Sequence, residues 1–152
     1  MREILFRAKR VDNGEWIEGN YVKAELIHDE GYEHYIIETM RHGKTYEIDP
    51  KTLCQYTGLK DKNGNRIWEN DIVSCEHEKY PDDNQLEVYP LLPDPIKYKR
   101  NYAVEFINTG SSYGYRLRNK SIHFMLTGNV IYNHEIEVLG NIFDNPEMLK
   151  EQ

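Results

Sequence analysis

The sequence has 152 residues, and its 19 lysine and arginine residues against 26 aspartate and glutamate residues give a formal net charge of −7 at pH 7. This length suits one domain or two small lobes, and such a chain buries about 70% of the surface that its unfolded form exposes. Hydrophobic and charged fractions of 39% and 30% argue against a largely disordered chain and against a membrane-spanning protein. The acidic balance disfavours sequence-independent nucleic-acid binding, which depends on clustered cations.

The N-terminal region and the two cysteines predict a cytoplasmic protein. The first apolar run, from Ile4 to Phe6, is too short for the core of a signal peptide. Without an export signal, Cys54 and Cys75 are expected to remain reduced and buried. We therefore expect the protein to be cytoplasmic and not to associate with a membrane.

The composition predicts a mainly β fold. Valine, isoleucine, threonine and aromatic residues number 45, against three alanines. Alternating or β-rich runs predict strands in chain order at residues 4–9, 16–22, 32–39, 71–77, 96–106, 113–118 and 135–139. The run at 96–106 alternates most clearly, and we expect it to pair with 113–118 through Gly110-Ser111-Ser112.

Turn and helix signals separate these runs. Asn13-Gly14 and Asn63-Gly64 are typical of two-residue hairpin turns of type I′, in which both residues have positive φ. A short C-terminal helix is expected through Met148 and Leu149, because Pro146 suits the first helical position and Asp144 or Asn145 can cap it.

Residues 78–95 form a proline-rich, acidic stretch that predicts an inserted loop. Four of the six prolines lie there. Proline lacks the N–H that a central strand needs. The apolar residues of this loop leave two interpretations open, which are docking onto another lobe or subunit and simple exposure to solvent.

Three stretches together resemble the YopX family of phage and prophage proteins: residues 6–8 (Phe-Arg-Ala), residues 55–73 and residues 138–147. The resemblance implies a phage-associated protein that self-assembles into homo-oligomers, with no catalytic residues to transfer. The family usually has glycine where this chain has Asn70, and asparagine tolerates left-handed backbone angles. The matching residues that we expect to shape turns are Gly58, Asn63, Gly64, Asn70, Asp71, Gly140 and Asn141.

The turn before residues 72–73 also resembles the start of an SH3-like barrel. We therefore expect an N-terminal β-rich lobe over residues 1–68. A small SH3-like barrel lobe over residues 69–152 would then carry the inserted loop 78–95 and the C-terminal helix.

Motifs for chemistry are weak in this sequence. Gly110 to Gly114 matches G-x-S-x-G, but the following residues alternate as a strand, whereas a nucleophile elbow leads into a helix. In residues 61–72, glycine occupies the fourth position instead of the sixth position of a calcium loop, and Ile72 stands where the final carboxylate is needed. Cys54, Cys75 and His77 lack the paired short spacing of a zinc site. No catalytic residue, cofactor or metal is assigned, and an enzyme is disfavoured.

Basic residues interleaved with tyrosines are the clearest remaining signal. They could form a small nucleic-acid-binding sheet or an ordinary solvated face. The candidate contacts, on residues 96–102 and 113–120, are Lys97, Lys99, Arg100, Arg116, Arg118 and Lys120. The leading hypothesis is a non-catalytic, phage-derived protein that self-assembles and binds a host or phage protein in a bacterial cytoplasm. Nucleic-acid binding is the alternative.

Overall fold

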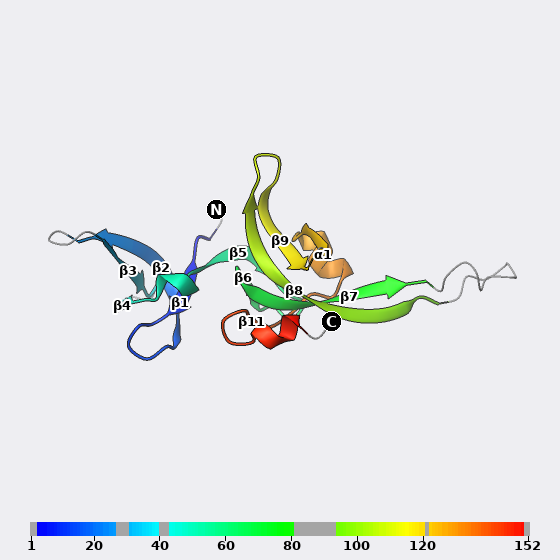
Figure 1. Ribbon diagram of the computed structural model, residues 1–152, viewed down its shortest axis with the longest axis horizontal. Coiled ribbons are helices and arrows are strands. Elements are labelled where there is room, and N and C mark those ends of the chain that lie inside the picture. The colour runs from blue at the N-terminus through cyan, green and yellow to red at the C-terminus, as the bar shows by residue number, and fades with distance from the viewer. Residues whose placement is uncertain (1–2, 27–30, 40–42, 81–93, 121, 151–152) are drawn as a thin grey trace, which may run out of the picture. The chain divides into compact units, whose positions relative to one another are not determined.

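The computed structural model describes residues 3–26, 31–39, 43–80, 94–120 and 122–150. The predicted mainly β fold is confirmed, since the strands form two antiparallel sheets (Figure 1). The chain divides into two compact units: unit 1 comprises residues 1–60 and 66–70, and unit 2 comprises residues 61–65 and 71–152. In the described ranges, no helix has the length and hydropathy needed to cross a bilayer.

Unit 1 holds a six-stranded sheet in the order β4-β3-β2-β1-β5-β6. Its strands are β1 (Phe6–Lys9), β2 (Trp16–Glu25), β3 (Tyr32–Ile37), β4 (Thr45–Glu47), β5 (Cys54–Lys60) and β6 (Arg66–Trp68). A 3-10 helix, η1 (Pro50–Thr52), precedes β5. Ala8, Ile36 and Ile48 form the centre of the core. Gly19 is required on β2, because a Cβ there would overlap the Ile37 carbonyl.

Unit 2 holds a five-stranded sheet in the order β10-β9-β8-β7-β11. Its strands are β7 (Asp71–Lys79), β8 (Ile96–Asn108), β9 (Tyr113–Asn119), β10 (Ile122–Met125) and β11 (Glu137–Asn141). The helix α1 (Gly128–Asn133) and the 3-10 helix η3 (Pro146–Leu149) complete the unit. Val73, Cys75, Tyr102, Val104 and Leu117 are buried on one face of this sheet.

The predicted hairpin between residues 96–106 and 113–118 is confirmed. β8 pairs with β9 from Ala103↔Arg118 to Asn108↔Tyr113. The alternation corresponds to burial only at Tyr102 and Val104, because the flanking even positions are partly or largely exposed. β8 is therefore longer than the core that it crosses.

The structure differs from the sequence-based prediction at three places. Residues 78 and 79 belong to β7, paired with Lys97 and Ile96, and are not part of a loop; the rest of the predicted insertion falls mostly in residues 81–93, outside the described part. The helix α1 was not predicted, although the Thr127 side chain caps it by accepting from the Val130 N–H. The predicted C-terminal helix is a single 3-10 turn, and Asn145 makes no side-chain cap there.

The five-stranded sheet is open in the described residues, with β10 and β11 at its two ends. The closed SH3-like barrel expected for residues 69–152 is therefore not confirmed. The structural division also assigns the turn Asp61–Asn65 to unit 2, whereas the predicted lobe boundary lay after residue 68.

Candidate functional site

The basic residues chosen from the sequence lie on two faces of the unit 2 sheet. The register Ala103↔Arg118 and Glu105↔Arg116 places odd positions of β8 and even positions of β9 on one face. Lys97, Lys99, Arg116 and Arg118 share that face. Arg100 lies on the opposite face, and Lys120 follows the end of β9 with a positive φ of 50°. The six residues therefore do not form one surface.

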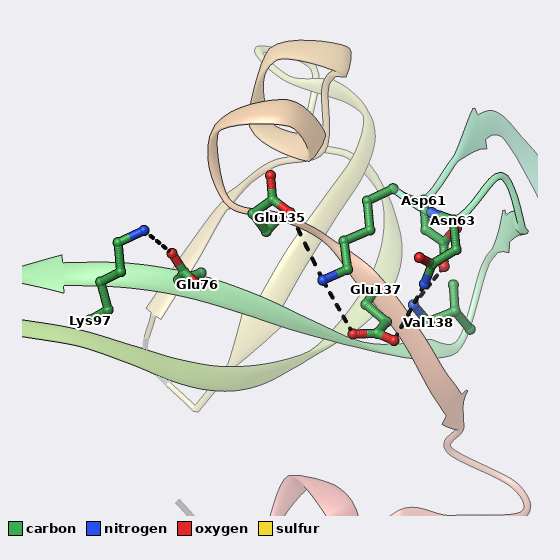
Figure 2. Close-up of polar contacts among 8 residues, drawn as sticks. Asp61, Asn63, Glu76, Lys97, Glu135, Glu137 and Val138 are labelled. Atoms are coloured by element: carbon green, nitrogen blue, oxygen red, sulfur yellow. Dashed lines mark hydrogen bonds and ion pairs between the residues drawn. The ribbon is translucent and has the colours of Figure 1, made fainter.

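Carboxylates of this sheet bind three of the four cations of the shared face, which are Lys97, Arg116 and Arg118. Glu105 receives bonds from Arg116 Nε at 2.9 Å and Arg118 Nη1 at 2.8 Å. Although burial opposes ionisation of Glu105, the two guanidinium groups outweigh it and lower its pKa. On β7, the Glu76 carboxylate accepts from Lys97 Nζ at 2.6 Å, which lowers the pKa of Glu76 (Figure 2).

These ion pairs have a consequence for recognition. Each paired carboxylate offsets positive charge that a phosphate backbone would otherwise attract. Glu78 adds to this on β7, 3.9 Å from Lys97 Nζ. Charges of opposite sign thus lie side by side on three strands of the shared face and stabilise the strand register.

A cluster of histidine and aromatic rings lies on the opposite face. The His77 ring is 5.4 Å from Tyr98, 5.7 Å from Tyr102 and 5.2 Å from His134, between centroids. The His77 Nε2 and Tyr102 hydroxyl are 3.0 Å apart. Phe124 of β10 packs edge-on against Tyr102, with centroids 5.2 Å apart. Four segments far apart in sequence therefore converge on one ring cluster.

Electrostatics within this cluster favour neutral His77. Burial, followed by the nearby His134 and Arg100, lowers the pKa of His77. His134 Nδ1 donates to the Glu76 carbonyl at 2.9 Å, since a carbonyl oxygen can only accept. The Glu76 N–H in turn donates to the His134 carbonyl at 2.7 Å. His134 thereby fastens the segment after α1 to the edge of β7.

Sequence reasoning missed this cluster. His77 was considered only together with Cys54 and Cys75 as a weak metal candidate, and no role was predicted for His134. Glu76 and His134 are 58 positions apart, and no local pattern connects them. The available signal was a period of two that places His77 on the buried face of its strand with Cys75.

The turn Asp61–Asn65 is built around one buried carboxylate (Figure 2). Asp61 Oδ1 accepts from the N–H of Asn63 at 2.9 Å and of Asn65 at 2.8 Å. Asp61 Oδ2 accepts from Asn65 Nδ2 at 3.2 Å and from the Val138 N–H of β11 at 3.1 Å. Burial disfavours the charged form, but these donors outweigh burial and lower the pKa of Asp61.

The two predicted type I′ turns differ from the structure. Gly14 and Gly64 have positive φ, at 72° and 86°, but Asn13 and Asn63 do not. The physical reason at the second turn is Asp61, whose side chain holds the Asn63 N–H while its carbonyl accepts from the Gly64 N–H at 3.0 Å.

The same turn is linked to the segment that follows α1. The Lys62 N–H donates to the Ile136 carbonyl at 2.9 Å, and Lys62 Nζ lies 3.5 Å from Glu137 and 3.9 Å from Glu135. Asn63 Nδ2 also donates to Glu137 at 3.3 Å (Figure 2). These contacts hold the turn against the rest of unit 2.

In unit 1, Arg7 and Asn70 of the resembling stretches contact aromatic and sulfur-containing side chains. The Arg7 guanidinium lies 4.8 Å from the Trp16 ring centroid and 5.2 Å from that of Trp68. Asn70, with φ at 66°, directs its Nδ2 to Cys54 Sγ at 3.6 Å. Cation–π contacts with two indole rings therefore account for the arginine of the Phe-Arg-Ala stretch.

The remaining predicted turn residues have local structural roles. Gly58 has φ at 85° within β5, where the register with β6 shifts. Gly140 lies at a register shift in β11, and a Cβ there would overlap the Asn145 side chain. Asn141 Oδ1 accepts from the N–H groups of residues 143 and 144, both at 3.0 Å. Asp71 is buried opposite Asn141 in the sheet.

The weak chemical motifs are placed as follows. Residues 110–114 cover the β8–β9 loop and the start of β9, with no helix after them. Within the described residues, no three His, Cys, Asp or Glu side chains are grouped as metal ligands. Burial raises the pKa of Cys75 to about 12, which makes its thiol a poor ligand and nucleophile.

Open depressions occur in both units. One in unit 1, of about 540 Å³, is bordered by Lys9, Glu33, His34 and Asp49 among others. One in unit 2, of about 580 Å³, lies between Lys62 and Tyr132. Both carry charges of both signs at their borders, which selects for no single ligand charge.

Comparisons with known proteins address the family and the fold. The family model described as YopX protein matches residues 5–150. Among solved structures, the crystal structure of protein EF1440 from Enterococcus faecalis matches with a TM-score of 0.53 and 21% identity, over 98% of this chain and 99% of that chain. This identity shows a shared fold alone. The search of curated proteins gave no match. Because the family match spans nearly the whole chain, and the resembling stretches form the turns and the arginine site described above, this protein belongs to the YopX family.

Proposed function

We propose that the protein is a non-catalytic binding protein that self-assembles and binds a host or phage protein. The observation that carries this proposal is the exposed aromatic tip of the β8–β9 hairpin. Phe106 and Tyr113 are 39% and 72% exposed, and their rings meet edge-to-face with centroids 5.1 Å apart. Rigid aromatic side chains of this kind anchor protein interfaces at small cost in conformational entropy.

The hairpin is well supported below its tip. Tyr115 is buried and packs against Phe106 with centroids 5.4 Å apart. The Ser112 N–H donates to Thr109 Oγ1 at 3.1 Å, and the Thr109 N–H donates to the Ser112 carbonyl at 3.0 Å, which orders the loop. A preorganised aromatic tip loses little freedom on binding, and this favours association.

Self-assembly is tested by light scattering coupled to size-exclusion chromatography over a wide range of protein concentration. We expect an oligomer for the unmodified protein, and a shift toward monomer for the double variant Phe106→Ser with Tyr113→Ser. Loss of two anchors of about 2 kcal/mol each weakens association by roughly 10³-fold. Tyr132→Ser is the matched control, since Tyr132 is 82% exposed on α1. A monomer at every concentration of the unmodified protein would refute self-assembly.

Nucleic-acid binding through residues 96–102 and 113–120 is the alternative, and the ion pairs with Glu76 and Glu105 weigh against it. Fluorescence anisotropy with short single-stranded and duplex DNA and RNA at low salt tests it. Micromolar binding that weakens steeply with salt would favour this alternative over protein binding.

A further inference from the structure

One edge of β8 is uncovered along half of its length. β9 pairs with β8 only from Ala103 to Asn108. β7 covers the other edge, from Ile96 to Ala103. Among the residues that the structure describes, no strand lies beside residues 96–100 on the edge where β9 would continue. Figure 1 shows β7 and β8 running on together beyond the other strands of unit 2.

The backbone groups that face this edge follow from the register. The Asn101 carbonyl accepts from Asn119 Nδ2 at 2.7 Å, so it points away from β7. In an antiparallel ladder every second residue points its N–H and C=O to the same side. Lys97 and Lys99 therefore direct their backbone groups outward. Glu76 is the cross-strand partner of Lys99. Its backbone N–H donates to the His134 carbonyl, away from β8, which agrees with this alternation.

The side chains beside this edge differ between the two faces. Lys97 and Lys99 lie on one face, and Lys97 Nζ donates to Glu76 of β7 at 2.6 Å and lies 3.9 Å from Glu78. Tyr98 lies on the other face, 40% exposed, beside the ring of His77. A strand placed along the edge would thus lie next to Lys97 and Lys99 on one face, and on the other next to the Tyr98 ring, which has the Arg100 guanidinium 5.9 Å from its centroid.

We propose that residues 96–100 of β8 receive an extended segment of a partner protein by β-strand addition, a segment that alternates acidic residues beside Lys97 and Lys99 with apolar residues beside Tyr98. The proposal rests on the proposed protein-binding function and names the chemistry of its partner. Main-chain hydrogen bonds to Lys97 and Lys99 supply the affinity, and the alternation of charge and apolar surface supplies the specificity.

A second copy of the same edge is a poor occupant. In an antiparallel pair, outward-facing residues of one strand lie opposite outward-facing residues of the other. Two β8 edges would therefore place Lys97 and Lys99 of one copy against the same lysines of the next, and like charges directly opposite are destabilising. Edge lysines commonly prevent self-pairing in this way. The charge pattern thus selects an acidic partner of a different sequence.

The test uses fluorescein-labelled nine-residue peptides and the full-length protein, with fluorescence anisotropy as the readout. The first peptide alternates glutamate and valine. The second has the same composition with the glutamates grouped at one end, and the third carries N-methyl groups at alternate residues, which removes the strand-pairing N–H groups without changing charge. We expect the first to bind at least about tenfold more tightly than the other two. Equal affinity for all three, or no binding of the first, would overturn the proposal.

Protein variants locate the binding edge. Lys97→Glu with Lys99→Glu should abolish binding of the acidic peptide and permit binding of its lysine–valine counterpart. The matched control, Lys44→Glu with Lys51→Glu, changes the same charge on exposed residues of unit 1 and should leave binding unchanged. Unchanged binding of the acidic peptide by the first pair would contradict the assignment.

Amide hydrogen exchange of the unmodified protein tests the same binding edge without any substitution, and so it serves if Lys97→Glu with Lys99→Glu disturbs folding. Added peptide should slow exchange at Lys97 and Lys99, and exchange unchanged at saturation would contradict strand addition. Unchanged exchange, together with an oligomer in light scattering, would refute strand addition and leave the proposed self-assembly standing. Binding of an oligonucleotide but of no peptide would replace the proposed protein partner with nucleic acid.

Discussion

Replacement of Asp61 by asparagine tests whether the turn Asp61–Asn65 is held by one carboxylate. Asparagine keeps an acceptor for the N–H groups of Asn63 and Asn65, but it places an NH₂ group where Oδ2 accepts from Asn65 Nδ2 and the Val138 N–H. Two hydrogen bonds to a charged acceptor are lost and donors then face donors. At roughly 1.5 kcal/mol for each bond, we expect a loss of about 3 kcal/mol in unfolding free energy.

Urea unfolding followed by circular dichroism measures this loss. With an m-value of roughly 2 kcal/mol per M, the midpoint should fall by about 1.5 M. Hydrogen exchange at the Val138 amide reports the same site directly and should accelerate. Asp94→Asn is the control, because Asp94 is exposed and is itself not part of a strand or helix. A loss below about 0.5 kcal/mol for Asp61→Asn would refute the reasoning, since it would make the two Oδ2 bonds dispensable.

The pH dependence of the same variant has a defined sign. The pKa of Asp61 is lowered in the folded protein, so the unfolded chain binds its proton more readily. Its stabilising contribution is therefore complete above the ordinary aspartate pKa of 3.8 and is lost as the pH falls through the lower, native pKa. The difference in stability between the unmodified protein and Asp61→Asn should shrink over that acidic interval.

Two further substitutions have expected outcomes. Arg7→Lys replaces a planar cation between two indole rings by a compact ammonium and should reduce the unfolding free energy by about 1 kcal/mol; tryptophan fluorescence during urea unfolding measures it, and an unchanged midpoint would contradict the cation–π role. His77→Gln removes a group whose native pKa is lowered, chiefly by burial. Stability of the unmodified protein should decrease as the pH falls from 6.5 through that lower pKa, and the variant should lack this component in urea midpoints measured from pH 5 to pH 7.5.

Local patterns were sufficient to predict the β8–β9 hairpin but not its chemistry. Alternation and a glycine-serine loop lie within one continuous stretch, so they predict both strands and their pairing. Whether Arg116 and Arg118 face solvent or a carboxylate depends on the register, because a shift of one residue would move Glu105 to the other face. The sequence therefore predicted basic strands and could not predict their neutralisation.

Contacts between distant segments account for most of what was missed. The Asn63-Gly64 pair suggested a type I′ turn, but the Asp61 side chain and β11 impose a different one. No helix was predicted at residues 128–133, although the Thr127 side chain caps α1. His134 reaches β7 only because α1 places it there. The Asp61 turn and the position of His134 thus depend on tertiary contacts, whereas the Thr127 cap is a local signal.

The residues that carry the family resemblance are mainly used inside the protein. Asp61 holds a turn, Arg7 lies between two indole rings, and Asn70 takes a left-handed angle beside Cys54. Such contacts fix the backbone, and a side chain that is engaged in this way has few atoms left for a partner. Under the proposed function, recognition depends on positions outside these stretches, such as the exposed tip at Tyr113 and the uncovered edge of β8. Chains that share these internal contacts can therefore have the same fold and still bind different partners.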